Sequence, residues 1–207
     1  MIKNLIFDWS GTLADDLRPV WKATNAIFEE YGAESLSLDN FRKHFRLPFA
    51  GFYEELLPQS NAADLEILYE KFFRNLQTEV TLLPGAREIL DICNQTGLRV
   101  FLLSTIRPDH FEIQATNLGV RDCFEHPYVG IPDKREKILE ILSERELAPH
   151  ETLFVGDMVH DIETARHANI AGAAVLTGFD TIEKLLPARP EMIFKNLTFL
   201  CRLLRVG

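Results

Sequence analysis

The stretch Leu5-Ile6-Phe7-Asp8-Trp9-Ser10-Gly11-Thr12-Leu13 places an aspartate directly after a short apolar run. The run has the length and composition of a buried strand, and Gly11-Thr12 ends it with a turn. Ligands of open α/β sheets bind at the carboxyl ends of the strands. The stretch therefore predicts that the Asp8 carboxylate stands at a ligand-binding edge of a sheet.

The composition is that of a folded protein with a sizeable core, since 46% of the 207 residues are hydrophobic. No run of about 18 uncharged apolar residues occurs, and the chain opens with a strand rather than with a basic region and an apolar signal segment. We therefore expect a cytoplasmic protein with no membrane partner. Three widely spaced cysteines, Cys93, Cys123 and Cys201, predict neither a disulfide framework nor a zinc knuckle.

The formal net charge of -9 opposes binding to nucleic acids and to anionic membranes through general electrostatics. We therefore expect no nucleic-acid partner. An anionic substrate has to be held locally, by a metal ion, a lysine or backbone amides. Monomer and homodimer both remain open.

The chain divides into a helical insert and an alternating α/β part. Apolar residues recur at helical spacing between residues 20–31 and 65–76, and no β-rich segment interrupts residues 16–81. Beyond Pro84-Gly85, apolar runs near 99–103, 128–129, 152–155 and 173–176 alternate with helices of 10 to 15 residues, and a short strand at 192–194 extends the series.

This pattern predicts an α/β core domain of residues 1–15 and 82–207, with a parallel sheet covered by helices on both faces. Residues 16–81 are predicted to form an inserted all-helical domain. Because the insert starts just after the Asp8 strand, it leaves the sheet at the same edge as the carboxylate. That is the position of a lid.

Four segments far apart in the sequence stand at predicted strand ends or helix starts: Asp8, Ser104, Lys134 and the run from Gly156 to Asp161. Each one alone has an ordinary reading as a turn, a cap or a solvated residue. Together they supply a nucleophilic carboxylate, a hydroxyl, a fixed cation and further acids, which is the set that in-line phosphoryl transfer requires. Oxygen ligands without a His or Cys partner favour Mg²⁺ over zinc. His160, inside the last segment, is expected to be a solvated helix residue without a role.

On these residues the sequence resembles the haloacid dehalogenase superfamily of hydrolases over essentially its full length. The matching motifs are Asp8 to Leu13 followed by Asp15, Leu102-Leu103-Ser104-Thr105, Lys134, and Gly156-Asp157 with Asp161. The insert is similar to the helical cap of the phosphoglycolate-phosphatase-like branch. The resemblance implies a Rossmann-like parallel sheet in the order 5-4-1-2-3, with Asp8 on the central strand.

The resemblance also implies a role for each matching position. Asp8 would attack phosphorus and form an aspartyl phosphate, while Ser104, Thr105 and Lys134 would hold the phosphoryl group or the substrate. Mg²⁺ would be bound by Asp8, the backbone carbonyl of Ser10, Asp157 and Asp161, and Thr12 would fix the turn. The small phosphorylated substrate would meet cations of the insert, for which Arg42, Lys43 and Arg46 are the candidates. The ordinary reading of residues 41–53 is that helix ends pack their aromatic rings and leave these bases in solvent.

Ser10 departs from the pattern of the family's phosphatases, which carry an aspartate at this position as general acid and base. Serine cannot replace it at neutral pH, and such groups contribute about 10²- to 10⁴-fold in rate. The sequence therefore predicts a phosphatase that is slow or restricted to good leaving groups. Dehalogenation is disfavoured, because the acids of a metal site, Asp157 and Asp161, are retained.

Two alternatives stay open. The first is phosphonate cleavage of the phosphonoacetaldehyde-hydrolase type, because those enzymes begin with D-W-A-G-T and use a cap lysine as a Schiff base. The nearest lysine in this chain is Lys43, a few residues before the expected place. The second is a catalytically weak phosphate-binding regulatory domain that keeps the fold and the metal.

Overall fold

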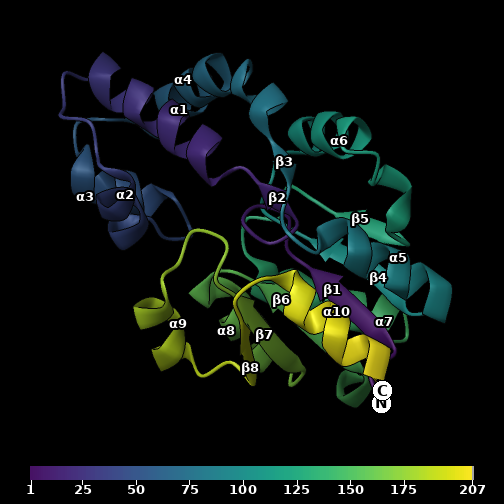
Figure 1. Cartoon of the computed structure of the whole chain (residues 1–207). Coiled ribbons are helices and arrows are strands. Elements are labelled where there is room, and N and C mark those ends of the chain that lie inside the picture. The colour runs from purple at the N-terminus through teal and green to yellow at the C-terminus, as the bar shows by residue number, and fades with distance from the viewer. Residues whose placement is uncertain (207) are drawn as a thin grey trace. The chain divides into compact units, whose positions relative to one another are not determined.

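The computed structural model describes residues 1–206 and separates into two compact units. Unit 1 comprises Met1–Asp15 and the chain from Thr81 onward, and unit 2 comprises Asp16–Val80. Figure 1 shows the strands gathered in unit 1, whereas the elements of unit 2 are helices.

Unit 1 is built on a six-stranded sheet in the order β5-β4-β1-β6-β7-β8, in which every neighbouring pair is parallel. The strands are β1 (Asn4–Phe7), β4 (Arg99–Leu103), β5 (His126–Tyr128), β6 (Thr152–Gly156), β7 (Ala171–Val175) and β8 (Met192–Phe194). The predicted α/β class is confirmed. The strand order differs in detail from the order 5-4-1-2-3 that the resemblance implied, because β8, the short strand expected at 192–194, is added beside β7. A separate antiparallel pair of β2 (Ala14–Asp15) and β3 (Thr81–Leu82) was not predicted at all.

Helices cover both faces of the sheet (Figure 1). They are α5 (Ala86–Thr96), α6 (Pro108–Asn117), α7 (Lys134–Glu144), α8 (Val159–His167), α9 (Ile182–Ala188) and α10 (Leu197–Val206), with short 3₁₀ turns η2 (Arg121–Cys123) and η3 (Pro149–Glu151). On one face, Ile6, Phe101 and Phe154 pack against Ile138 of α7 and Ala165 of α8. Side chains that alternate with these along the strands point to the other face, where α5 and α10 pack together.

The core of unit 1 supports the site because its strands are fully enclosed. Leu5, Ile6 and Phe7 of β1 are completely buried, as are Leu102 and Leu103 of β4. Each such side chain contributes about 1.5–3 kcal/mol relative to exposure. The carboxyl ends of the central strands are therefore rigid platforms for the residues that follow them.

Unit 2 contains α1 (Leu17–Glu30), α2 (Leu38–His44), α3 (Ala50–Leu56), α4 (Ala62–Phe73) and the 3₁₀ turn η1 (Leu76–Glu79). The segment 41–53 contributes two short helices whose rings pack together. Phe41 lies 4.9 Å from Phe45 and 5.8 Å from Phe52, measured between ring centroids, and Phe28 of α1 lies 6.1 Å from Phe52. Phe28, Phe41 and Phe52 are buried core residues of unit 2, as the ordinary reading expected, and Phe45 is half-buried against them.

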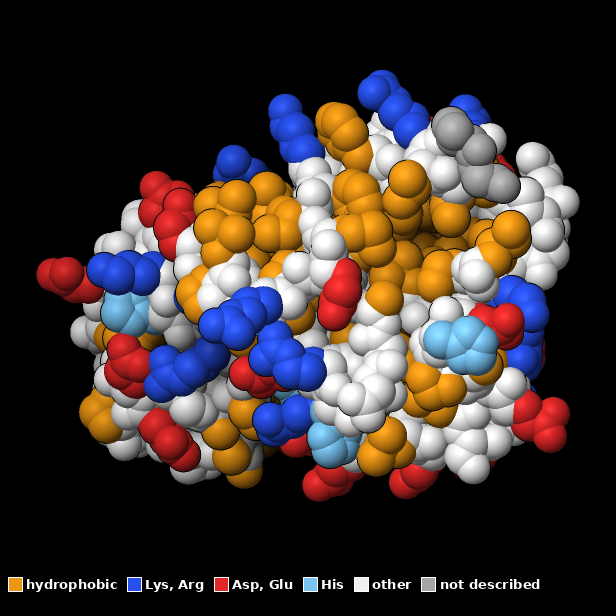
Figure 2. All heavy atoms as spheres, turned by 90° about the horizontal axis from the view of Figure 1, so that it is seen from below, with side chains coloured by type: hydrophobic (Ala, Val, Ile, Leu, Met, Phe, Trp, Pro, Cys, Tyr) orange, Lys and Arg blue, Asp and Glu red, His pale blue; other side chains and the backbone are white. Residues whose placement is uncertain are grey.

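The surface of unit 1 carries exposed apolar side chains on its two C-terminal helices. These side chains are Ile182 and Leu186 on α9, and Phe199 and Leu203 on α10. Figure 2 shows hydrophobic side chains gathered over part of the face that it draws, bordered by basic and acidic groups. Within residues 1–206, no helix has the length and apolar character needed to cross a bilayer.

Candidate active site

Three predicted site residues follow three neighbouring strands of the sheet. Asp8 comes directly after β1, Ser104 after β4 and Asp157 after β6. The register aligns the strand ends, because Phe7 pairs with both Leu102 and Val155. The Asp8 N–H continues the ladder by donating to the Val155 carbonyl at 2.9 Å. The parallel strands therefore bring the three side chains to one edge.

Three buried carboxyl groups meet at this edge. Oxygen atoms of Asp8, Asp157 and Asp161 all lie within 4.8 Å of one another. Asp8 is 4% exposed, and the other two are fully buried. Asp161 reaches the cluster from the first turn of α8. The fold thus brings it within 4.8 Å of Asp8, which lies far from it in the sequence.

Lys134, the first residue of α7, supplies the positive charge of the cluster. Its side chain is fully buried, with Nζ 2.6 Å from Asp161 Oδ1 and 2.8 Å from Asp8 Oδ1. Burial lowers the pKa of this lysine, but the carboxylates of Asp161 and Asp8 outweigh burial and raise the pKa above its ordinary value. Lys134 is therefore a charged group held beside Asp8.

One ammonium does not balance three carboxylates. Burial raises the pKa of Asp8 against the lowering effect of Lys134, and burial together with repulsion from Asp161 and Asp8 raises the pKa of Asp157 well above its usual range. These shifts describe a site that lacks positive charge. A divalent cation would restore the balance.

The hydrogen bonds distinguish Asp161 from Asp8. Both oxygens of Asp161 are engaged, since Oδ1 accepts from Lys134 and Oδ2 accepts the N–H groups of Asp157 and Met158 at 3.1 and 3.0 Å. Asp8 Oδ1 has no hydrogen bond of good geometry among residues 1–206, although Lys134 Nζ lies 2.8 Å away. An oxygen-only set that includes an underused buried carboxylate fits a hard divalent cation.

The turn after Asp8 is held against Asp157. Gly11 adopts a φ of +73°, which favours glycine, and a Cβ at this position would lie 2.6 Å from Asp157 Oδ2. Thr12 Oγ1 donates to Asp157 Oδ1 at 3.0 Å, so Thr12 ties the turn after Asp8 to the residue that follows β6. Asp157 is therefore the partner through which Thr12 would fix the turn. The sequence did not indicate this pair, because the two residues are 145 positions apart.

Trp9 anchors the other side of the turn and was missed by sequence reasoning. Its indole is completely buried, donates to Gln114 Oε1 at 2.7 Å and meets the Phe111 ring edge-to-face at 5.0 Å. Both partners lie on α6. The alternation of apolar side chains could have indicated that Trp9 is buried, and a buried Trp needs an acceptor for its N–H. The acceptor itself could not be identified, because Gln114 is 105 residues away in the sequence.

The remaining predicted residues of unit 1 lie at the same edge. Ser104 is 1% exposed, its Oγ accepts the Ile106 N–H at 3.3 Å, and it is among the groups that lower the pKa of Asp8. Thr105 is half-buried beside it. Ser10 is also half-buried, in a bridge to Ala14. No carboxylate occupies position 10.

The three predicted substrate cations belong to unit 2. Arg42 and Lys43 lie in the last turn of α2. Arg46 is held within unit 2, because its guanidinium pairs with Glu55 at 2.5 Å and donates to the Gly51 carbonyl. Their contact with substrate stays a prediction.

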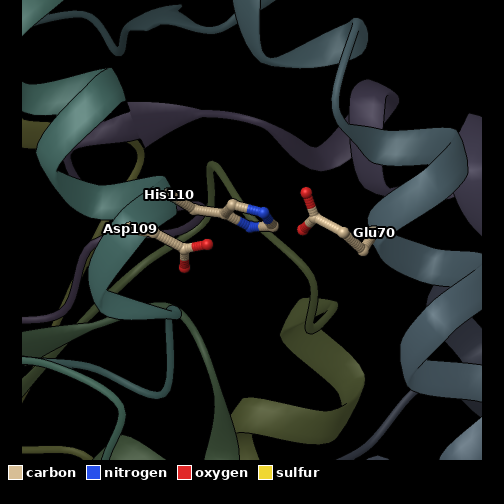
Figure 3. A group of neighbouring side chains, drawn as sticks. All are labelled: Glu70, Asp109 and His110. Atoms are coloured by element: carbon tan, nitrogen blue, oxygen red, sulfur yellow. The ribbon is translucent and has the colours of Figure 1, made fainter.

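The start of α6 adds ionisable groups that the sequence analysis did not single out. Asp109 and His110 occupy its first turn, where both are labelled in Figure 3. Asp109 pairs with Arg107 at 3.1 Å, and hydrogen bonds from this guanidinium lower the pKa of Asp109. His110 is buried.

His160 is not the solvated residue that the sequence predicted. It is 6% exposed, and its Nε2 accepts the backbone N–H of Lys134 at 3.3 Å. Burial and the neighbouring Lys134 lower the pKa of the imidazole, in agreement with a neutral acceptor ring. The prediction was wrong because α8 packs its polar first turn against the carboxylate cluster rather than against water.

Replacing His160 with leucine is expected to destabilise the protein by about 1–3 kcal/mol, since the Lys134 N–H at the start of α7 then becomes a buried donor without a partner. His160→Gln should recover most of this loss, because its amide oxygen can stand where Nε2 stood. Urea denaturation measures the free energy of unfolding. His150→Leu, whose side chain is 81% exposed, is the control and should change little; equal losses in the Gln and Leu variants would contradict the assignment.

Comparison with known proteins agrees with this geometry. Residues 5–175 match the family of haloacid dehalogenase-like hydrolases. A phosphoglycolate phosphatase of Synechococcus elongatus is 24% identical over 199 residues, covering 94% of this chain and 93% of the relative. The pyrophosphatase PpaX of Listeria welshimeri is 24% identical over 219 residues, covering 99% and 97%. A haloacid dehalogenase-like hydrolase of Streptococcus pneumoniae superposes with a TM-score of 0.87 over 98% of each chain at 22% identity. The chain therefore belongs to the haloacid dehalogenase-like hydrolase family.

Proposed function

We propose that the chain is a Mg²⁺-dependent phosphatase of small phosphorylated metabolites, with Asp8 as the nucleophile. The observation that carries the proposal is the buried cluster in which Asp8 faces Lys134 at 2.8 Å and shares its edge with Asp157 and Asp161. Relatives named phosphoglycolate phosphatase and pyrophosphatase support a phosphoryl group as the target.

In the first step, an Asp8 carboxylate oxygen attacks phosphorus while the bond from phosphorus to the leaving oxygen breaks. Lys134 keeps Asp8 ionised and faces the transferred group, and the Ser104 hydroxyl donates a hydrogen bond to a phosphoryl oxygen. Water then attacks phosphorus, releases inorganic phosphate and regenerates Asp8.

Asp8, Asp157 and the backbone carbonyl of Ser10 would hold the metal ion. The ion would neutralise charge on the phosphoryl oxygens. Asp161, whose two oxygens already accept three hydrogen bonds, orients the cluster rather than completing the coordination. The proposed ligands are therefore Asp8, Ser10 and Asp157, and Asp161, the fourth residue of the predicted set, holds the other groups in place.

Ser10 limits both steps. Without an acid, the leaving group has to depart as an anion, which favours anhydrides and acyl phosphates over alkyl phosphates. Without a base, hydrolysis of the aspartyl phosphate is slow even when its formation is fast. Good substrates therefore give a burst of leaving group close to one equivalent of enzyme, followed by slow turnover.

Recognition of the rest of the substrate falls to unit 2, which serves as the cap. Its cations Arg42, Lys43 and Arg46 would meet a second anionic group. The net charge of -9 requires such local bases, since the protein as a whole repels anions.

The test is a Mg²⁺-dependent screen of alkyl phosphates, acyl phosphates, pyrophosphate and phosphonoacetaldehyde, followed by rapid-mixing kinetics on the best substrate. A burst that needs Mg²⁺ supports the proposal. Binding of metal and phosphate without any turnover would instead favour a regulatory phosphate-binding domain. A borohydride-trapped adduct with phosphonoacetaldehyde would favour phosphonate cleavage.

Ser10→Asp is expected to raise the steady-state rate with an alkyl phosphate by about 10²- to 10⁴-fold, because it restores a group that protonates the leaving alcohol and activates water. It should also abolish the burst on good substrates. Ser10→Asn, which is similar in size but not acidic, is the control. If both variants behave alike, another group already fills the role of the missing acid.

A further inference from the structure

The segment Thr177–Asp180 follows β7 at the carboxyl edge of the sheet, and no role for it was predicted. We propose that this segment, here called the β7 bracket, is a positioning element that holds the Gly11 turn and Asp157 at a fixed separation. Thr177 is its key side chain. The inference rests on the proposed metal site.

Three hydrogen bonds join the bracket to three parts of the site. Thr177 Oγ1 donates to the Gly11 carbonyl at 2.7 Å, and the Phe179 N–H donates to Asp157 Oδ2 at 2.7 Å. Asp180 Oδ2 accepts the Val159 N–H at 2.8 Å, in the first turn of α8, the helix that carries Asp161. A single four-residue segment therefore contacts the nucleophile turn, one acid and the start of the helix that bears another.

These bonds close a ring around Asp157. The Gly11 carbonyl belongs to the planar peptide that joins Gly11 to Thr12, so the Thr177 hydroxyl fixes the orientation of Thr12. Thr12 Oγ1 holds Asp157 Oδ1, and Phe179 holds Asp157 Oδ2. Both oxygens of the acid are thus held, one from the turn and one from the bracket, while Thr177 joins turn and bracket directly.

Gly11, Gly178 and the Asp157 carboxylate are packed so closely that no side chain fits between them. A Cβ on Gly178 would overlap the Asp157 carboxylate, and a Cβ on Gly11 would lie 2.7 Å from the Gly178 Cα. The two backbones touch because both positions are glycine. Phe179 and Asp180 are each 3% exposed and anchor the bracket, and Asp180 Oδ1 also pairs with Lys184 at 2.8 Å.

The experiment compares Thr177→Val with Thr177→Ser, using Mn²⁺ as the probe. Valine keeps the shape but removes the donor, and it is expected to weaken Mn²⁺ binding, followed by electron paramagnetic resonance, by about tenfold and to lower kcat with little change in KM. Serine should stay within about twofold of wild type. Thr181→Val, a matched change whose hydroxyl makes no cap hydrogen bond, should have no effect.

A metal-free measurement keeps the two proposals separate. Hydrogen exchange of the Phe179 amide and of the Thr12 to Ala14 amides should accelerate about tenfold in Thr177→Val and remain at the wild-type rate in Thr177→Ser. Unchanged exchange in Thr177→Val, or equal acceleration in both variants, overturns the bracket. Failure of the wild-type protein to bind Mn²⁺ contradicts the proposed metal site instead. The exchange rates then still test whether Thr177 holds the Gly11 turn and Asp157 in place.

Discussion

Replacing Asp8 with asparagine is expected to reduce phosphate release to the level of the buffer control and to abolish the burst of leaving group. The amide keeps the shape of the side chain but cannot attack phosphorus to form the acyl phosphate. The protein should remain folded, because the change removes one of the two carboxyl groups that share Lys134 and leaves Asp161 paired with it. Rapid-mixing kinetics and urea denaturation on the same preparation measure both effects.

The matched control for this prediction is Asp91→Asn, the same chemical change at an exposed position of α5. It should leave both the burst and the free energy of unfolding as they are. A burst that persists in Asp8→Asn would show that another group is the nucleophile. A burst lost together with the fold would point to a structural role for Asp8.

Much of the site was accessible from the sequence because it follows a geometric rule. Parallel strands present their carboxyl ends at one edge, so residues after three recognisable strands had to meet there. Asp8, Ser104 and Asp157 obey this rule. Lys134 does not follow a strand, and its place depended on the resemblance to a known family rather than on periodicity.

The same rule could have indicated the β7 bracket, since Thr177 lies only two residues after the end of β7. They escaped attention because a Thr-Gly pair is also an ordinary turn signal. The contact that gives Thr177 its role spans 166 residues of sequence, and a single sequence contains no sign of that pairing.

Helix α8 shows where hydrophobic periodicity fails. His160, Asp161 and Thr164 are all buried there, although each is polar. Periodicity assumes that the buried face of a helix is apolar. A helix that packs against a charged cluster buries hydrogen-bonded polar groups instead, so the assumption assigned His160 to solvent.

Lys134→Met is expected to destabilise the protein by about 3–5 kcal/mol, the usual cost of removing one partner from a buried ion pair. Methionine fills similar space, but Asp8 and Asp161 then lack their common cation. The loss should be smaller at pH 5 than at pH 8. Without the ammonium the folded-state pKa of Asp8, already raised by burial, rises further. The folded protein then binds more protons than the unfolded chain, so its stability falls as the pH rises above the ordinary carboxyl pKa of about 4.

Urea denaturation of Lys134→Met at the two pH values measures this effect, and the double variant Lys134→Met/Asp161→Asn tests its cause. Asp161→Asn removes one of the two unpaired acids, so the double variant should be more stable than Lys134→Met alone at pH 8. Lys137→Met, the same change in a lysine with a partly exposed side chain on the same helix, should cost no more than about 1 kcal/mol. A Lys134→Met loss that is independent of pH and unrelieved by Asp161→Asn would mean that packing, rather than charge, is what Lys134 contributes at the centre of the site.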